Sequence, residues 1–274
     1  DPTQPALTIT AVAGPLHGQG SLVDGEVLFA PDINFHGTAS FTYTVTDQYG
    51  LSTEGTATLV IAAVNDAPVT QGETSTTVED TALVFTQAEL LANDSDVDVS
   101  TDGQVLRIST VSGAVNGTVT MLANGDIRFV PAVNYHGPAE FTYTVSDGNG
   151  GTTDAKVNLS ITAVNDAPVV VGEMVAATED TSFYIEATGL LANDSDVDDG
   201  ATRRYSIATA VPGLTFNEDG SYSFDANNAA YNSLKDGDSN LIVVPYTVTD
   251  DKGATATANL SITVTGVNDA PVAV

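Results

Sequence analysis

The chain has 274 residues, 42% of them hydrophobic, and 36 acidic against 7 basic side chains give it a formal net charge of −29. The apolar content is sufficient for a folded core, whereas the charge argues against nucleic acid and anionic lipid as partners, since both require clustered Lys and Arg. The absence of Cys and the presence of only three His exclude disulfides and leave little for zinc sites or histidine-based catalysis.

The sequence shows neither a membrane-spanning window nor the pattern of a signal peptide. No window approaches the roughly 18 consecutive apolar residues of a membrane span, so we expect no direct membrane insertion. Asp1–Pro5 has neither the charged nor the apolar region of a signal peptide. We interpret both ends as cuts in a longer protein.

Internal repeats organise the chain. The segment Val64–Val69, which reads Val-Asn-Asp-Ala-Pro-Val, recurs from Val164 and again from Val267, a step of about 100 residues. Residues 91–98 and 191–198 are identical. Matches of this length, repeated at one step, indicate tandem modules of a single type.

The repeats predict three domains, residues 1–68, 69–168 and 169–274, which we call repeats 1, 2 and 3. Leu7 aligns with Leu106, so repeat 1 lacks the opening third of the pattern. It is therefore a partial repeat, either truncated or the second half of a domain that an insertion interrupts.

Each repeat is predicted to consist of β-strands. Phe41, Tyr43 and Val45 alternate with threonines, the period-two pattern of a half-buried strand. The same alternation covers residues 56–61, 156–161 and 257–262. One exception is Thr86–Leu91, whose composition favours a short turn of helix.

Roughly seven short strands in about 100 residues, separated by Asp-Gly and Asn-Gly turns, indicate an antiparallel Greek-key sandwich. The predicted fold class is all-β, with tandem Greek-key β-sandwich modules of the Ig-like kind arranged end to end. The Asn-Asp-Ala-Pro segments would join the modules, and their prolines would stiffen the joints and stop strands from running through them.

The acidic residues recur at fixed positions. Asp194, Asp196 and Asp198 are spaced at i, i+2 and i+4, and their carboxylates would repel one another without a cation. Calcium binds six to eight oxygens, so such a loop suits it. An EF-hand is excluded, because twelve-residue counting from Asp194 ends on Tyr205, where a bidentate Glu is required.

These segments together resemble the cadherin family. Asn65-Asp66-Ala67-Pro68 looks like the cadherin interdomain linker, and Glu79 looks like the glutamate of the first cadherin strand. Asp94-Ser95-Asp96 resembles the cadherin Asp-x-Asp motif, and the strand that ends at Asp147 resembles the later strand with a terminal ligand. The specific form is similar to the cadherin-like repeats of giant RTX-type bacterial adhesins that type I systems secrete. The cadherin Asp-Arg-Glu segment is absent, which leaves the number of ions per joint open.

The resemblance implies Ca²⁺ ligands at each joint. At the joint of repeats 2 and 3 these are Glu79, Asn165, Asp166, Asp194, Asp196 and Asp250. At the joint of repeats 1 and 2 they are Asn65, Asp66, Asp94, Asp96 and Asp147. A half-site for a following repeat would use Glu179, Asn268 and Asp269, and the extra candidates are Asp80, Asp98 and Asp198.

The leading functional hypothesis is a non-enzymatic extender segment of an extracellular bacterial surface adhesin, stiffened by calcium and acting in cell or surface adhesion and biofilm formation. Its partners would be the neighbouring repeats of the same chain. The alternative is a β-sandwich module that binds carbohydrate or peptide, for which repeat 3, with Arg203-Arg204, is the best candidate. An enzyme is not expected, because no nucleophile or acid–base set can be assembled.

Overall fold

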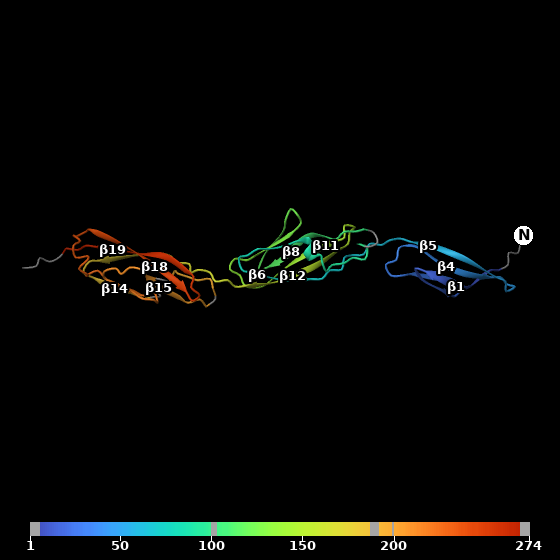
Figure 1. Ribbon diagram of the computed structural model, residues 1–274, viewed down its shortest axis with the longest axis horizontal. Helices are drawn as coiled ribbons and strands as arrows, with labels where there is room; N and C mark the ends of the chain where they lie inside the picture. The colour runs from blue at the N-terminus through green and yellow to red at the C-terminus, as the bar shows by residue number, and fades with distance from the viewer. Residues whose placement is uncertain (1–5, 100–102, 187–191, 199, 269–274) are drawn as a thin grey trace, which may run out of the picture. The chain divides into compact units, whose positions relative to one another are not determined.

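The computed structural model describes residues 6–99, 103–186, 192–198 and 200–268 (Figure 1). The chain divides into two compact units, Asp1–Thr162 and Ala163–Val274, and each is described by itself. The predicted all-β fold is confirmed, since the described elements are strands with one four-residue helix. No helix among these residues has the length and apolar character needed to span a bilayer.

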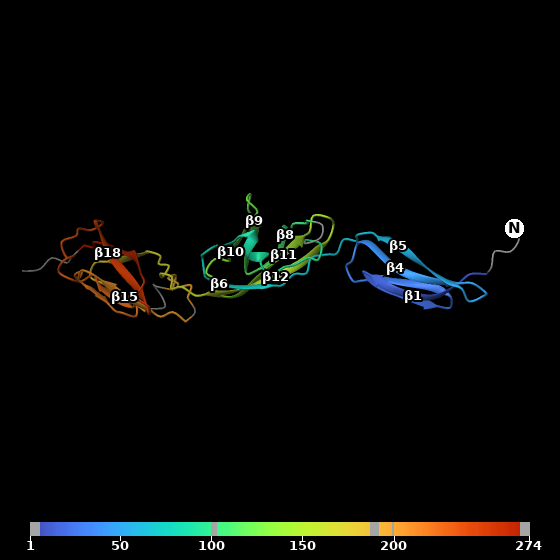
Figure 2. The same ribbon diagram turned by 45° about the vertical axis from the view of Figure 1, so that its right-hand side comes forward.

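Repeat 2 is a two-sheet sandwich of seven strands (Figures 1 and 2). The strands are β6 (Glu73–Val78), β7 (Leu83–Phe85), β8 (Arg107–Val115), β9 (Gly117–Met121), β10 (Ile127–Pro131), β11 (Gly137–Ser146) and β12 (Thr152–Thr162). One sheet has the order β6-β12-β11-β8, and the other has the order β7-β10-β9. All neighbours are antiparallel except β6, which runs parallel to β12.

The period-two alternation of the sequence builds the core of repeat 2. On β11, Phe141, Tyr143 and Val145 are fully buried, whereas the threonines between them are partly exposed. On the second sheet, Phe129 is also fully buried, and its ring stacks on Phe141 with centroids 5.8 Å apart. The two inner faces thus interdigitate as expected for stacked sheets.

The predicted helical turn is confirmed as α1 (Gln87–Leu90). Thr86 caps it with a capping box, in which the Glu89 N–H donates to the Thr86 hydroxyl and the Thr86 N–H donates to the Glu89 carboxylate. Leu90 places its side chain in the core of repeat 2.

Repeat 3 repeats the same arrangement with its own core. Its strands are β13 (Glu173–Thr178), β14 (Ser182–Ile185), β15 (Arg203–Ile207), β16 (Leu214–Phe216), β17 (Tyr222–Asp225), β18 (Ser239–Asp250) and β19 (Thr255–Thr265). The sheets have the orders β13-β19-β18-β15 and β14-β17-β16, with β13 parallel to β19. The buried aromatic rings of Tyr222, Phe224 and Tyr246 fill the centre.

The described residues of repeat 1 form five strands: β1 (Thr8–Leu16), β2 (Gly18–Val23), β3 (Glu26–Pro31), β4 (Gly37–Thr46) and β5 (Ser52–Ile61). They form the sheet β1-β4-β5 and the hairpin β2-β3. The register of β4 on β5, which begins with Gly37 opposite Ile61, is the register of β11 on β12. Repeat 1 thus has the counterparts of β8 to β12, and its described residues contain no counterpart of β6 or β7.

Candidate calcium-binding loops

The linker Asn65–Pro68, which precedes repeat 2, is hydrogen-bonded to two acidic positions of that repeat. The Asn65 side-chain amide donates to Asp147 Oδ2 at 2.7 Å, and the Asp66 backbone N–H donates to Asp98 Oδ2 at 2.9 Å. Gln104 adds a third contact by donating to Asn65 Oδ1 at 2.8 Å. The predicted ligands Asn65, Asp66 and Asp147 therefore lie together, and Asp98 joins them.

The position of Asp147 follows from the turn that ends β11. Asp147 Oδ1 accepts backbone hydrogen bonds from Asn149 at 2.7 Å and from Gly151 at 3.1 Å. A Cβ on Gly151 would collide with Asp147 Oδ2 and come within 2.9 Å of the Asp66 carbonyl oxygen, so this close approach requires glycine. The hydrogen bond from Asn65, followed by those from the turn, holds the pKa of Asp147 below its ordinary value. The lowered pKa favours the ionised carboxylate, which is the form that binds cations.

The acidic loop of repeat 2 is attached to the linker through the backbone. The Val69 N–H donates to the Ser95 carbonyl at 2.7 Å, and the Ser95 N–H donates back to Val69 at 3.0 Å. Within the loop, the Asp98 N–H donates to Asp96 Oδ1 at 2.8 Å, an Asx-type turn. This turn directs the Asp98 carboxylate to the linker.

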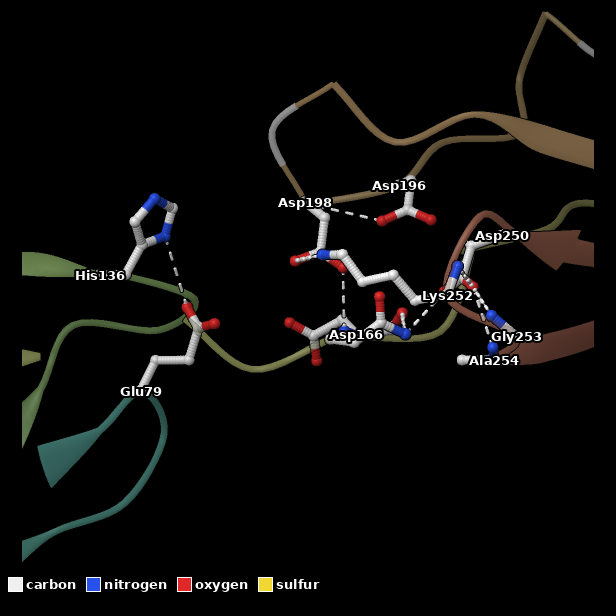
Figure 3. Close-up of polar contacts among 10 residues, drawn as sticks. Glu79, His136, Asp166, Asp196, Asp198, Asp250, Lys252, Gly253 and Ala254 are labelled. Atoms are coloured by element: carbon white, nitrogen blue, oxygen red, sulfur yellow. Dashed lines mark hydrogen bonds and ion pairs between the residues drawn. The ribbon is translucent and has the colours of Figure 1, made fainter. Parts of the chain in front are cut away.

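The linker before repeat 3 forms the same cluster with the acidic loop and the strand end of that repeat (Figure 3). Asn165 donates to Asp250 Oδ2 at 2.7 Å, and the Asp166 N–H donates to Asp198 Oδ2 at 3.1 Å. Although burial opposes the charged form of Asp250, the hydrogen bonds from Asn165 and from the turn that follows keep its pKa below its ordinary value. The Asp198 N–H donates to Asp196 Oδ1 at 3.0 Å. The arrangement is thus a property of the repeat and recurs with the sequence motif.

The two clusters differ at the second residue after the strand-ending aspartate. Lys252 of repeat 3 places its Nζ 3.7 Å from Asp198 Oδ1 (Figure 3), whereas the corresponding position of repeat 2 is Asn149. The Lys252 side chain is 52% exposed and the Asp198 side chain is 8% exposed. Repeat 3 therefore carries an internal cation beside its acidic loop.

Asp94 and Asp194, both predicted ligands, contact a different set of groups. Asp94 Oδ1 accepts from the Gln71 N–H at 2.9 Å, and burial raises the pKa of its carboxyl. The Tyr143 hydroxyl, which lies beside Asp94, donates to the Glu73 carboxylate at 2.9 Å, and burial also raises the pKa of Glu73. The first Asp of the motif thus joins a buried carboxyl–tyrosine group inside the repeat.

The same buried group recurs in repeat 3. Asp194 accepts from the Val171 N–H at 2.9 Å, and Tyr246 donates to Glu173 at 3.0 Å. Burial raises the pKa of both carboxyl groups. The glutamate–tyrosine pair was not predicted from the sequence, although its signal was present: a Glu, Glu73 or Glu173, stands five residues after the linker proline in both full repeats.

The predicted glutamates lie at the opposite end of each repeat. Glu79 is 5% exposed, and its carboxylate lies 3.9 Å from the His136 ring (Figure 3). Glu179 is 1% exposed, and its Oε2 accepts from the Val267 N–H at 3.3 Å, directly before Asn268. Glu179 thus adjoins the start of the following linker, as the predicted half-site requires, while Asp269 lies outside the described residues. The neighbouring Asp80 lies in the turn after β6, where its Oδ1 accepts from the Asn134 N–H at 3.1 Å.

The donor set of these loops fits calcium. It consists of carboxylate, amide and carbonyl oxygens, which hard cations prefer. Several buried oxygens have no hydrogen-bond partner, namely Oδ2 of Asp94, Asp96, Asp194 and Asp196, Oδ1 of Asn165, and Oε1 of Gln104 and Glu179. Unpaired buried oxygens are costly, and a cation would satisfy them. Within the described ranges, no three acidic or histidine side chains already converge closely enough to hold a metal ion.

Three models of protein families match successive parts of the chain. Residues 64–162 match a cadherin-like domain, residues 165–266 match a bacterial cadherin-like domain, and residues 1–60 match a bacterial Ig domain. Domains of these kinds are typical of extracellular surface proteins, and none of the three models describes a catalytic domain. No curated protein matches the chain.

Solved cadherin structures share the fold. Mouse cadherin-23 EC22-24 matches with a TM-score of 0.58 and 16% identity, over 98% of this chain and 89% of that one. Mouse protocadherin-24 EC1-3 matches with a TM-score of 0.53 and 17% identity, over 95% and 90%. The chain spans 56% of the human desmocollin-1 ectodomain, at 13% identity, 98% coverage of this chain and a TM-score of 0.44. The chain therefore carries tandem cadherin-like repeats beside a segment that matches a bacterial Ig domain, which supports a bacterial surface protein.

Proposed function

We propose that the chain is an extender segment of an extracellular bacterial adhesin, in which calcium stiffens the joints between repeats. The observation that supports the proposal is the recurrence of one cluster, built from the linker, the acidic loop and the end of a strand, with buried oxygens that lack partners. Such a segment would serve cell or surface adhesion and biofilm formation by holding distal binding domains away from the cell.

Each cluster would hold the ion with residues from three places: the linker, the acidic loop and the end of a strand. At the linker before repeat 2 these are the linker residues Asn65 and Asp66, the loop residues Asp96 and Asp98, and Asp147. Calcium would supply positive charge to this cluster and coordinate oxygens that otherwise face one another. The hydrogen bond from Asn65 to Asp147 holds the linker against the turn in a position that an ion would reinforce.

The backbone explains how ion binding at the loop would stiffen a joint. The paired hydrogen bonds of Val169 and Ser195, at 2.8 and 2.9 Å, fasten the end of the linker to the acidic loop. An ion that also engages Asn165 and Asp166 would fix the residues on the other side of Pro168, so that the linker would no longer act as a hinge. Small polar interfaces between domains otherwise permit relative motion.

The alternative function as a glycan-binding module draws no support from the arginines of repeat 3. The Arg203 guanidinium donates to the Asp194 carbonyl oxygen, and the Arg204 guanidinium lies 3.6 Å from the Glu218 carboxylate. Both side chains therefore have contacts within their own repeat. We accordingly favour the extender.

Small-angle scattering of the chain in Ca²⁺ and in chelator tests the proposal. We expect calcium to increase the maximum dimension, narrow the distribution of conformations and raise the melting temperature, because ligand binding to the ordered form adds stability by mass action. Sodium at matched ionic strength is the control for general charge screening. Identical scattering and melting curves in calcium and in chelator would exclude the proposal.

A further inference from the structure

One sheet of repeat 3, β13-β19-β18-β15, carries apolar side chains on its outer face, the face directed away from the core. Met174 is 85% exposed, Leu241 is 59% exposed and Val243 is 50% exposed. Ser261 of β19 is in register with Met174 on one side and with Val243 on the other, so the exposed side chains belong to neighbouring rows of one sheet. The full apolar cluster consists of Met174 and Ala176 on β13 and of Leu241, Val243 and Pro245 on β18.

The corresponding face of repeat 2 is more polar. Val243 stands where repeat 2 has Glu140, and Glu140 forms an ion pair at 2.7 Å with Lys156. Met174 stands where repeat 2 has Thr74. Because the two sheets share their strand order and register, the fold itself does not require apolar side chains on this face of repeat 3.

The outer face of this sheet also lacks carboxylates. The outward positions of the four described strands hold no acidic side chain, although the chain has 36 acidic residues and a net charge of −29. The charged side chain at these positions, Arg204, lies 3.6 Å from the Glu218 carboxylate of the same repeat. The face therefore carries an apolar cluster and no net charge.

These two properties determine which partner fits the face. A basic partner would be attracted to the acidic loops and not to a neutral surface, because complementary charges direct association. The complement of a neutral aliphatic face is another neutral aliphatic face, and a second copy of this chain provides one. Two copies that met through acidic surfaces would instead place like charges opposite one another, which is costly.

We propose that the outer face of β13-β19-β18-β15 is a contact through which two copies of the chain associate face to face. One surface patch is sufficient for such a pair, because a two-fold contact uses the same patch on both copies. The four strands have 6, 11, 12 and 5 residues, so the face covers roughly 500 Å² at about 3.3 Å per residue and about 4.8 Å between strands. A stable interface buries about 800 Å² per partner, and the dimer is accordingly weak and reversible.

Sedimentation equilibrium of the full chain in chelator tests the proposal without any contribution from calcium. Between about 1 μM and 1 mM chain, the range of weak association, we expect the mean mass to rise toward that of two chains. Sodium chloride should strengthen the association, because salt screens the repulsion between two acidic chains. A mass that stays at one chain throughout would overturn the proposal, as would an association that salt weakens.

A matched pair of variants tests whether this face makes the contact. Val243→Glu introduces the side chain that repeat 2 has at this position, and it should weaken association at least about tenfold, because the contact would desolvate a carboxylate. The control, Val133→Glu, adds the same charge at a valine of repeat 2 that is 82% exposed, and it should leave association nearly unchanged. Equal effects of the two substitutions would contradict the proposed contact.

The absence of Cys from the chain allows the contact to be located directly. Thr263→Cys introduces a single thiol on the outer face of repeat 3, and Ser160→Cys introduces one at the same register position of repeat 2. A short bifunctional maleimide should join two copies through Thr263→Cys and not through Ser160→Cys. Equal cross-linking of the two variants would refute face-to-face association through repeat 3.

Discussion

Replacing Asp147 by Asn separates the role of this residue in its turn from its role in calcium binding. Asp147 Oδ1 accepts backbone hydrogen bonds from Asn149 and Gly151, and Oδ2 accepts from the Asn65 amide at 2.7 Å and from the Gly151 N–H at 3.0 Å. In the variant Asp147→Asn, the amide oxygen can keep the turn, but its NH₂ then faces the NH₂ of Asn65, so two donors meet and one negative charge is lost. We expect calcium affinity of repeat 2 to fall by about 10- to 100-fold, the range found when residues around bound metals are changed.

Repeat 1 offers a matched control. Asp47 ends β4 as Asp147 ends β11, and its Oδ1 accepts from Tyr49 at 2.8 Å and from Leu51 at 2.9 Å. Asp47→Asn should therefore disturb a similar turn and leave calcium affinity unchanged. The assay is calorimetric titration of calcium, with melting curves in calcium and in chelator. Equal losses of calcium affinity in Asp47→Asn and Asp147→Asn would refute the reasoning.

Two further predictions use matched pairs of residues. Lys252→Asn should raise the calcium affinity of repeat 3 about two- to fivefold, since a half-exposed ion pair contributes roughly 0.5–1 kcal/mol. The control is Lys156→Asn, which removes the β12 lysine of an exposed ion pair with Glu140. This control should leave the calcium affinity of repeat 3 unchanged in the same titration. Phe129→Ala should lower the free energy of unfolding of repeat 2 by about 3–5 kcal/mol, whereas Phe29→Ala should cost repeat 1 about 1–2 kcal/mol because this ring is only partly buried. Denaturant titration distinguishes the two values, and equal costs would contradict the difference in burial between the two rings.

Local patterns predicted the strands and the short helix because each is encoded by a few neighbouring residues. The alternation of Phe141, Tyr143 and Val145 became a strand with that face buried, and the Thr86 capping box became a helical turn. The linker contact of Asp147 was also implied by the resemblance, since the motif order brings the end of one strand to the linker.

The acidic loop shows where sequence reasoning stops. The i, i+2, i+4 spacing alone does not show which of Asp94, Asp96 and Asp98 contacts the linker. The structure gives the three carboxylates different contacts through residues distant in sequence. The hydrogen bonds between Val69 and Ser95 orient the loop, and the Gln71 N–H donates to Asp94 Oδ1. Which carboxylate faces the linker thus depends on tertiary contacts that no local pattern encodes. The roles of these residues as calcium ligands stay a prediction.

The buried carboxyl groups lead to a final prediction on pH. Burial raises the pKa of Glu73 and of Glu173, so the folded chain binds a proton at these groups more tightly than the unfolded chain does. Stability is then highest where both groups are protonated, and it falls as the pH rises from the unfolded value of about 4.3 through the raised folded values. The hydrogen-bonded carboxylates Asp147 and Asp250 act in the opposite direction, because their lowered pKa values preserve stability until the pH falls below the ordinary range of Asp.

Without calcium, the melting temperature should therefore rise on mild acidification from neutral pH and fall again in stronger acid. Gln in place of Glu73 keeps an acceptor for the Tyr143 hydroxyl and removes the titrating carboxyl group. Glu73→Gln should therefore reduce the acid-induced rise in the melting temperature of repeat 2 and leave the rise of repeat 3 unchanged. The measurement is a set of melting curves in chelator across the acidic range. A melting temperature that only falls from neutral pH downward, in the parent chain and the variant alike, would show that these buried carboxyl groups do not govern the stability. The excess of acidic residues would then act only at the exposed surface and through the hydrogen-bonded turns.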